Sequence, residues 1–96
     1  MKQVTRKIGR NRGKPRLWIE GPALIRAGLD HGNRWDLIPA PSGFDIVRNN
    51  PAGKRKIAGR PGRPIIDISG PRSLGAVADV EVVTLNISDG KIEVRR

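Results

Sequence analysis

The sequence predicts a mostly-β protein in which two related units share one barrel and each unit contributes a single short helix. Three observations lead to this prediction. β-Branched Ile and Val far outnumber Leu, and they favour strands. The 12 Gly and 8 Pro interrupt the chain too often for long helices. One sequence pattern also occurs twice. A chain of 96 residues is expected to form a single domain, 1–96, with a modest core.

The repeated pattern relates residues 6–22 (RKIGRNRGKPRLWIEGP) to residues 55–71 (RKIAGRPGRPIIDISGP). At an offset of 49 residues the two segments share eight identical positions. From Gly28 onward an offset of 47 gives the best match. The units therefore run from about 6–49 and about 55–96, with NNPAG between them. Neither unit can bury an apolar face alone, so we expect them to share a core as an internal pseudo-dimer.

The first element common to both units is a half-buried strand, expected at residues 16–20 and 65–69. Both runs alternate apolar and polar positions, which places one set of side chains on each face of a strand. Pro15 and Pro64 stand at the start of these strands, where the missing N–H donor is tolerated.

Each strand is followed by the signals of a helix of one or two turns. Glycine is acceptable as an N-cap, proline is preorganised for the first helical position, and a left-handed glycine ends a helix. These signals are Gly21, Pro22 and Gly28 in the first unit and Gly70, Pro71 and Gly75 in the second.

Two hairpins complete the units. We expect strands at 34–38 and 80–87, turns at PSG and SDG, and final strands at 44–48 and 91–95. This assignment makes Gly43 the counterpart of Gly90. A further strand is expected before each basic loop, at 4–8 and 54–58.

The net charge of +10 is concentrated in two segments, a basic N-terminal arm (1–16) and a basic linker (48–63). Neither contains Asp or Glu, and the rest of the chain carries a small net negative charge. Such acid-free basic segments are typical of polyanion binders, because each Lys or Arg on a phosphate releases condensed counterions. The alternative is that they are solvated segments kept for solubility; their matching positions in the repeat favour nucleic-acid contact.

The candidate nucleic-acid contacts are the cations of these segments. Arg can bond guanine bidentately in the major groove, and we assign phosphate contact and base-edge reading to Arg10, Arg12, Lys14, Arg16, Arg60 and Arg63. Other cations are expected to position the nucleic-acid backbone without reading sequence: Arg6, Lys7, Lys54, Arg55 and Lys56. Loop glycines are expected to adopt positive φ and allow close approach to the duplex: Gly9, Gly13, Gly59 and Gly62.

The aromatic residues and the single histidine have structural interpretations. Trp18 faces away from its apolar neighbours, so it packs on the other barrel face or on a partner, or stacks on a base; packing is favoured. Trp35 and Phe44 are predicted to lie in the core. His31 is predicted to be a solvated turn residue.

Other function classes find no support in the sequence. It contains no carboxylate pair spaced for acid–base chemistry, no phosphate loop, no nucleophile elbow and no cysteine. We therefore expect no enzymatic activity, no metal and no cofactor. No apolar segment approaches the length of a membrane span. We expect a cytoplasmic protein with no membrane partner, in a bacterial cell or a phage-infected host.

Residues 62–94 (GRPIIDISGPRSLGAVADVEVVTLNISDGKIEV) resemble the AbrB/MazE swapped-hairpin family. That family's pattern is Gly-Arg, a short strand, a brief helix ending in Leu-Gly, a strand, an Asp-Gly turn and a last strand. Residues 15–37 (PRLWIEGPALIRAGLDHGNRWDL) are similar to its SymE-like branch. The whole chain also resembles a small domain fused ahead of phage and proteobacterial DNA cytosine methyltransferases. It departs from the pattern at residues 32–33 and 78–79, where the family carries Gly-Asp.

The resemblance implies a DNA-binding swapped-hairpin (AbrB-like) β-barrel, normally assembled from two units and here supplied by one chain. We therefore expect a small basic DNA-binding protein that regulates transcription or another DNA transaction of a phage or prophage. Two alternatives stay open. One is RNA binding, as in the SymE-like branch; the other is a phage interaction module that inhibits a host protein. A homodimer also stays open.

Overall fold

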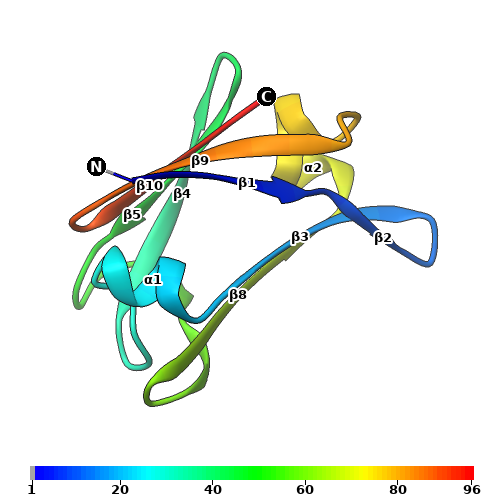
Figure 1. Ribbon diagram of the computed structural model, residues 1–96. Helices are drawn as coiled ribbons and strands as arrows, with labels where there is room; N and C mark the ends of the chain where they lie inside the picture. The colour runs from blue at the N-terminus through cyan, green and yellow to red at the C-terminus, as the bar shows by residue number, and fades with distance from the viewer. Residues whose placement is uncertain (1) are drawn as a thin grey trace.

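In the computed structural model, which describes residues 2–96, the chain folds into two antiparallel β-sheets and two short helices (Figure 1). The six-stranded sheet has the order β1 (Lys2–Lys7), β9 (Val82–Ser88), β10 (Lys91–Arg95), β5 (Gly43–Arg48), β4 (Arg34–Ala40) and β6 (Arg55–Lys56). The four-stranded sheet has the order β2 (Gly9–Asn11), β3 (Lys14–Glu20), β8 (Arg63–Ser69) and β7 (Ala58–Arg60). The helices are α1 (Pro22–Arg26) and α2 (Pro71–Leu74), and α2 continues into a 3-10 turn (Gly75–Val77).

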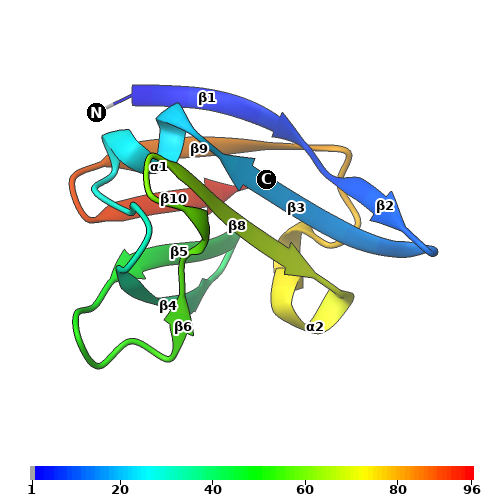
Figure 2. The ribbon, with the colours of Figure 1, turned by 90° about the horizontal axis from the view of Figure 1, so that it is seen from below.

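The mostly-β class is confirmed, but the predicted closed barrel is wrong, because both sheets of the described chain are open. At Ile8 and at Ile57 the chain leaves the edge of the larger sheet and enters the smaller one (Figure 2). The Ile8 N–H donates to Glu81 O at 2.8 Å, and the Ile57 N–H donates to Asn33 O at 3.1 Å. The edge strands therefore end at these crossings instead of closing a cylinder.

The core lies between the two sheets and is formed by the inward-facing residues of both. Alternate residues of β3 and β8 are fully buried, as the period of two requires. Trp35 is 3% exposed and Phe44 is 1% exposed, which confirms their predicted core positions. The described residues contain no buried charged side chain, so apolar burial is the main source of stability.

Local signals located the first elements of each half correctly. The predicted strands at 16–20 and 65–69 lie within β3 and β8, each of which begins one residue before its proline. Gly21 and Gly70 are the N-caps of α1 and α2, with proline in the first turn.

The final hairpins correct the sequence alignment. β4 aligns with β9, and β5 with β10, at an offset of 48 residues rather than 47. Gly43 is a buried strand residue, whereas Gly90 lies in a turn with φ 76°, so the two are not counterparts. The sequence alignment matched identical residues, two glycine pairs together with Val47/Val94 and Arg48/Arg95, but a shift of one residue moves every side chain of a strand to its other face.

Each strand of the N-terminal half has a counterpart in the C-terminal half that lies equally far from the opposite edge of the same sheet. The counterparts are β1 and β6, β4 and β9, and β5 and β10 in the larger sheet, and β2 and β7, and β3 and β8, in the smaller one. The registers are centred on two cross-strand pairs, Trp18 with Asp67 and Asp45 with Glu93. Matching hydrogen bonds close the ends of the β3–β8 pair: Gly21 N–H to Pro64 O at 3.1 Å, and Gly70 N–H to Pro15 O at 2.9 Å. The two halves thus occupy equivalent places in the fold.

Candidate nucleic-acid interface

The first basic loop is the tight turn of the β2–β3 hairpin. Asn11 pairs with Lys14 across it, and the two central residues, Arg12 and Gly13, have φ of 55° and 79°. Two successive positive φ values define a type I′ turn, whose twist matches that of the flanking strands. Arg12 is the only non-glycine residue of the described chain with positive φ. The turn therefore holds an arginine at its tip in a conformation that L-residues disfavour.

The second basic loop is the tight turn of the β7–β8 hairpin. Arg60 pairs with Arg63 across it, and Pro61 and Gly62 form the tip, with Gly62 at φ 77°. Proline followed by a positive-φ glycine suits a type II turn. Asp30 Oδ1 accepts the Gly62 N–H at 3.1 Å, so the loop after α1 holds this tip against the body of the protein.

The loop glycines follow the sequence prediction with one exception. Gly13, Gly59 and Gly62 have positive φ as expected. Gly9 does not, because it lies in the regular strand β2 opposite Arg16. At Gly59 a Cβ atom would collide with the carbonyl oxygen of Arg63, so the close pairing of β7 and β8 itself requires glycine.

The two hairpin tips lie at opposite ends of the four-stranded sheet, because β3 and β8 run antiparallel (Figure 1). Lys14 begins β3 and Arg63 begins β8. With a rise of about 3.3 Å per residue, these two residues lie roughly 25 Å apart along the strand pair. The sequence predicted related positions for the loops; it did not reveal that they point away from each other.

The cations of the two tips are free and exposed. Arg10, Arg12, Lys14, Arg60 and Arg63 are all exposed. Among residues 2–96, Arg16 is the only one of the eleven predicted contact residues that forms an ion pair with Asp or Glu. We call these five exposed residues the tip cations. They are available to an external anion.

Arg16 has a different environment. Its Nε and Nη2 donate to the Asp67 carboxylate at 2.8 and 2.9 Å, and its guanidinium lies 4.6 Å from the centre of the Trp18 ring. Hydrogen bonding to Asp67 is the main reason that the pKa of Arg16 is raised. Trp18 is 39% exposed, so it packs beneath Arg16 rather than in a core. The middle of the sheet is thus self-neutralised.

The five cations expected to position the backbone lie on or beside the edge strands of the six-stranded sheet. Arg6 and Lys7 are on β1, and Lys54–Lys56 are in or directly before β6. Arg55 lies over the Trp35 ring at 5.2 Å. These strands lead directly into β2 and β7, so two tracks of positive charge run along the chain toward the two tips.

The outer face of the six-stranded sheet neutralises its own charge. On this face Arg95 Nη2 lies 2.8 Å from Asp45 Oδ1 and 3.5 Å from Glu93 Oε2. Lys91 Nζ lies 3.8 Å from Asp45 Oδ2 and 3.7 Å from Glu93 Oε2. Two cations and two carboxylates thus balance one another, which leaves the tips as the better site for a polyanion.

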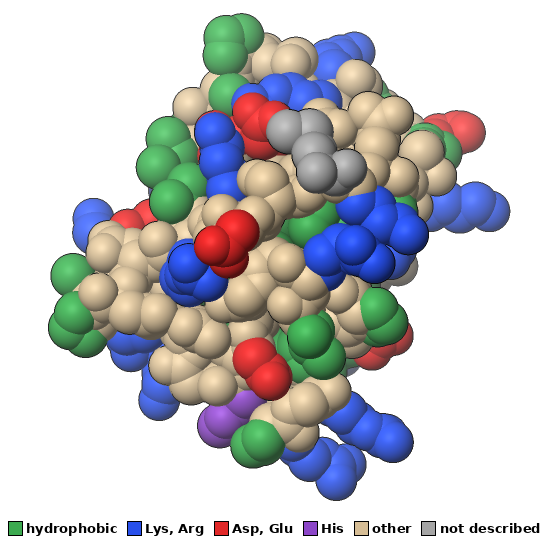
Figure 3. Space-filling view, turned by 60° about the vertical axis from the view of Figure 1, so that its left-hand side comes forward, with side chains coloured by type: hydrophobic (Ala, Val, Ile, Leu, Met, Phe, Trp, Pro, Cys, Tyr) green, Lys and Arg blue, Asp and Glu red, His purple; other side chains and the backbone are tan. Residues whose placement is uncertain are grey.

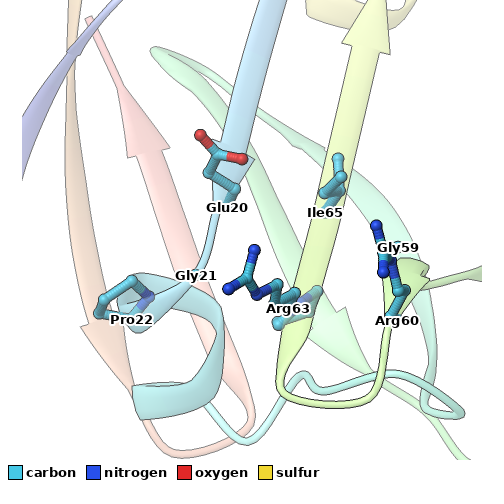
Figure 4. A pocket seen from close by; sticks show the side chains of 8 residues that line it. Glu20, Gly21, Pro22, Gly59, Arg60, Arg63 and Ile65 are labelled. Atoms are coloured by element: carbon cyan, nitrogen blue, oxygen red, sulfur yellow. The ribbon is translucent and has the colours of Figure 1, made fainter.

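A groove of about 460 Å³ lies beside the second tip (Figure 4). Arg63 extends from β8 toward Gly21 and Glu20 at the end of β3, and Arg60 stands on the other side of β8. Glu20 is exposed and lies beyond ion-pair distance of both arginines. The groove can therefore receive an anionic group at Arg63 or at Arg60, while the Glu20 carboxylate opposes anions on the side toward which Arg63 extends.

On the face shown in Figure 3, Lys and Arg side chains project on several sides, with Asp and Glu side chains among them. Positive charge is therefore distributed over this face rather than gathered into one cluster.

Within residues 2–96, no group of three or more His, Cys, Asp or Glu side chains could hold a metal ion. No helix in the same range is long and apolar enough to cross a membrane.

Comparison with known proteins identifies no relative: neither a protein-family model, nor a curated protein, nor a solved structure matches the chain.

Two residues important to the site were missed by the sequence interpretation. Asp30, which anchors the second tip, gave no local signal because its partner is 32 residues away. The Arg16–Asp67 pair could have been predicted from the repeat. At the 49-residue offset Asp67 is the counterpart of Trp18, and the two counterparts pair across β3 and β8, which brings Asp67 close to Arg16.

Proposed function

We propose that this protein binds duplex DNA through the two hairpin tips of its four-stranded sheet. The observation that carries the proposal is that exposed, unpaired tip cations gather at equivalent turns at both ends of one sheet. Phosphate contact is the interaction such cations favour, because counterion release supplies most of the electrostatic affinity. The Arg12 and Gly13 tip is also narrow enough to approach a base edge, where arginine reads guanine.

The spacing of the tips supports a short footprint. A separation of roughly 25 Å corresponds to about seven or eight base pairs at 3.4 Å each. It exceeds the width of either groove of B-DNA, about 12 and 6 Å, so the two tips would not face each other directly across one groove. Between the tips, Arg16 and Asp67 neutralise each other, which is consistent with phosphate contact at two separate points.

The AbrB-like resemblance is part of the same proposal. The exchangeable strand order and the registers centred on two cross-strand pairs support an internal duplication of swapped-hairpin type. Both sheets are open, so the proposed relationship is one of topology and not of a closed barrel. We propose that the protein regulates transcription or another DNA transaction in the cytoplasm of a bacterial cell or phage-infected host.

A salt series with two nucleic acids tests the proposal. We expect binding to a random 16-base-pair DNA duplex to show a log–log salt slope of about −4 to −8, for five to eight phosphates. An RNA hairpin of equal charge is expected to bind more weakly, because A-form helices present a deep, narrow major groove. A slope near zero would contradict nucleic-acid binding. Tighter binding to the RNA would assign the protein to the RNA-binding class.

A further inference from the structure

The two halves of the six-stranded sheet differ at their outer edges, and the difference exposes a strand edge. In the C-terminal half, β9 is covered along its length by β1, which pairs with it from Lys2 to Lys7. In the N-terminal half, the equivalent strand β4 is covered by β6 only at Arg34 and Trp35. Among residues 2–96, no strand therefore lies on the outer side of residues 36–40 of β4 (Figure 2).

Hydrogen bonds within the chain explain why β6 is so short. The Lys54 N–H donates to Asp36 Oδ1 at 2.9 Å, and Asn49 Nδ2 donates to Asp36 Oδ2 at 2.8 Å. Together with the bonds of Arg34 to Asn49, Asn50 and Gly53, these bonds hold residues 49–54 at the Arg34–Asp36 end of β4, so this segment does not run along residues 37–40. The pKa of Asp36 is lowered, chiefly because Asn49 donates to its carboxylate. Both carboxylate oxygens of Asp36 are thus used within the chain.

The free edge offers specific backbone groups. Ala40 and Gly43 close the two-residue turn between β4 and β5, which makes them a hydrogen-bonded pair. By alternation, Asp36 and Ile38 bond to β5, whereas the Leu37 N–H and C=O and the Pro39 C=O face outward. One donor and two acceptors are therefore available to an added strand.

A groove lies on each side of this edge. On the core side, a groove of about 340 Å³ is lined by Leu37, Phe44, Leu74, Arg55 and Arg72, among others. On the outer side, a groove of about 420 Å³ is lined by Asp36, Leu37, Ile38, Lys54 and Arg55. Successive side chains of an extended peptide point to opposite sides, so the two grooves would receive alternate residues of one added strand.

The other half of the fold shows what suits the core-side groove. There Val4 of β1 pairs with Leu85 of β9 and packs against the core. Leu37 holds the place of Leu85 at the 48-residue offset, yet it is only partly buried. A β-branched or similar apolar side chain, placed opposite Leu37 as Val4 is placed opposite Leu85, would complete this part of the core.

We propose that the β4 edge binds an extended acidic peptide of another protein, which pairs with Leu37 and Pro39 as a seventh strand of the sheet. The grooves carry Lys54, Arg55 and Arg72, none of which forms an ion pair with an acidic residue among residues 2–96. Their charge favours carboxylates near both ends of the apolar residue. This binding site does not include the two hairpin tips, although Lys54 and Arg55 also belong to the track of positive charge that leads to the second tip.

A second copy of this chain is a poorer occupant of the edge. Pairing of β4 with β4 would bring the two sets of Lys54, Arg55 and Arg72 together, and pairing with the outer edge of β1 would add Lys2 and Arg6. Like charges across an interface oppose such pairing. Pro39, which has no N–H, also blunts the edge against self-association. An acidic peptide needs only the bonding groups of Leu37 and the Pro39 carbonyl.

Peptide titration of the full chain tests the proposal. The probes are the capped peptide EETVTVEE, the charge-reversed KKTVTVKK, and EETPTPEE, which keeps the charge but cannot pair as a strand. We expect EETVTVEE to shift the backbone amide resonances of residues 35–38 and of Ala40, and to slow exchange of the Leu37 amide by about tenfold or more. EETPTPEE is expected to bind at least about tenfold more weakly, and KKTVTVKK to show no binding.

Matched variants locate the binding. Arg72→Glu, in α2 beside the groove, is expected to weaken EETVTVEE binding by about tenfold. Arg26→Glu, in α1 beside the covered edge of β9, changes the net charge equally and is expected to have less than about a twofold effect. The proposal is overturned if EETPTPEE binds as tightly as EETVTVEE, if both variants weaken binding equally, or if the shifts lie at the hairpin tips.

Discussion

The two hairpin tips occupy equivalent places in the fold but are held differently. The first carries Arg12 in a left-handed conformation and has no side-chain bond to the rest of the protein among the described residues. The second has a Pro61-Gly62 turn whose Gly62 N–H is bound by Asp30. The first tip can therefore adapt to a ligand, whereas the second is fixed in advance. Equivalent topology thus does not impose equivalent local stability.

The largest expected effect comes from removing the charge of either tip. Arg10→Ala with Arg12→Ala, and separately Arg60→Ala with Arg63→Ala, should each reduce the magnitude of the salt slope for duplex DNA by about 2 and the affinity at 0.1 M salt by about tenfold or more. The measurement is fluorescence anisotropy over a salt series.

The control for this pair removes two exposed cations outside the tips, Arg26→Ala with Arg72→Ala. Loss of two distant charges is expected to lower affinity by less than about threefold, because salt screens them. If the control loses as much affinity as the tip variants, net charge rather than the tips governs binding.

Removing the Asp30 bond to the second tip should make that tip as free to move as the first one. Asp30→Ala removes the acceptor of the Gly62 N–H and of the His31 N–H, and is expected to lower the free energy of unfolding by about 1 kcal/mol. Hydrogen exchange should accelerate at Gly62 and stay unchanged at Gly13. The matched control is Asp79→Ala. The Asp79 side chain is 79% exposed, and its ion pair with Arg96, at 3.9 Å, is long, so its loss is expected to cost little stability. Unchanged exchange at Gly62 would show that Asp30 does not anchor the tip.

Relieving the first tip should stabilise the fold at the expense of binding. Arg12→Asn places a residue that tolerates positive φ in the type I′ turn, and is expected to raise the free energy of unfolding by about 0.5–1 kcal/mol. The DNA salt slope should fall in magnitude by about 1. Urea denaturation and anisotropy check the two effects. Lower stability of the variant would indicate that Arg12 is not strained in the protein.

The smallest expected effect is on the pH dependence of thermal stability, through Asp36, which binds the segment that leads to the second tip. Asp36 holds the Lys54 N–H before β6, and its pKa is lowered, first by Asn49 and then by Lys54. Because the folded pKa lies below the unfolded one, the stabilisation is complete above about pH 4 and is lost as pH falls through the folded value. Thermal unfolding of Asp36→Asn should differ from wild type above pH 4, and the difference should shrink below it. A difference that grows toward acid would reverse the assigned sign.

The elements that depend on local chemistry could be predicted from the sequence. Alternation of apolar residues located β3 and β8, and the Gly-Pro pairs located the starts of α1 and α2. The predicted core positions of Trp35 and Phe44 are also confirmed. These features are set by a few neighbouring residues, so a short stretch of sequence contains the whole signal.

Features that depend on pairing between distant strands could not be predicted. Identical residues in the two halves predict an offset of 47 for the final hairpins, whereas the inward faces of β5 and β10 require 48. The barrel is expected because two units must share a core, but the chain crosses between the sheets at Ile8 and Ile57 and leaves both sheets open. The tips were recognised as a pair, yet only the antiparallel register of β3 and β8 places them at opposite ends.

Titration of backbone amide resonances with a 12-base-pair DNA duplex tests the central claim most directly. We predict that the amide resonances of residues 9–14, 58–60 and 62–63 shift together, at the same duplex concentration, while those of residues 91–95 on the self-neutralised face stay unchanged. A shorter duplex of five base pairs cannot span roughly 25 Å, so it should shift either tip with lower affinity. Shifts confined to the six-stranded sheet, or equal affinity for both duplexes, would contradict a two-tip interface.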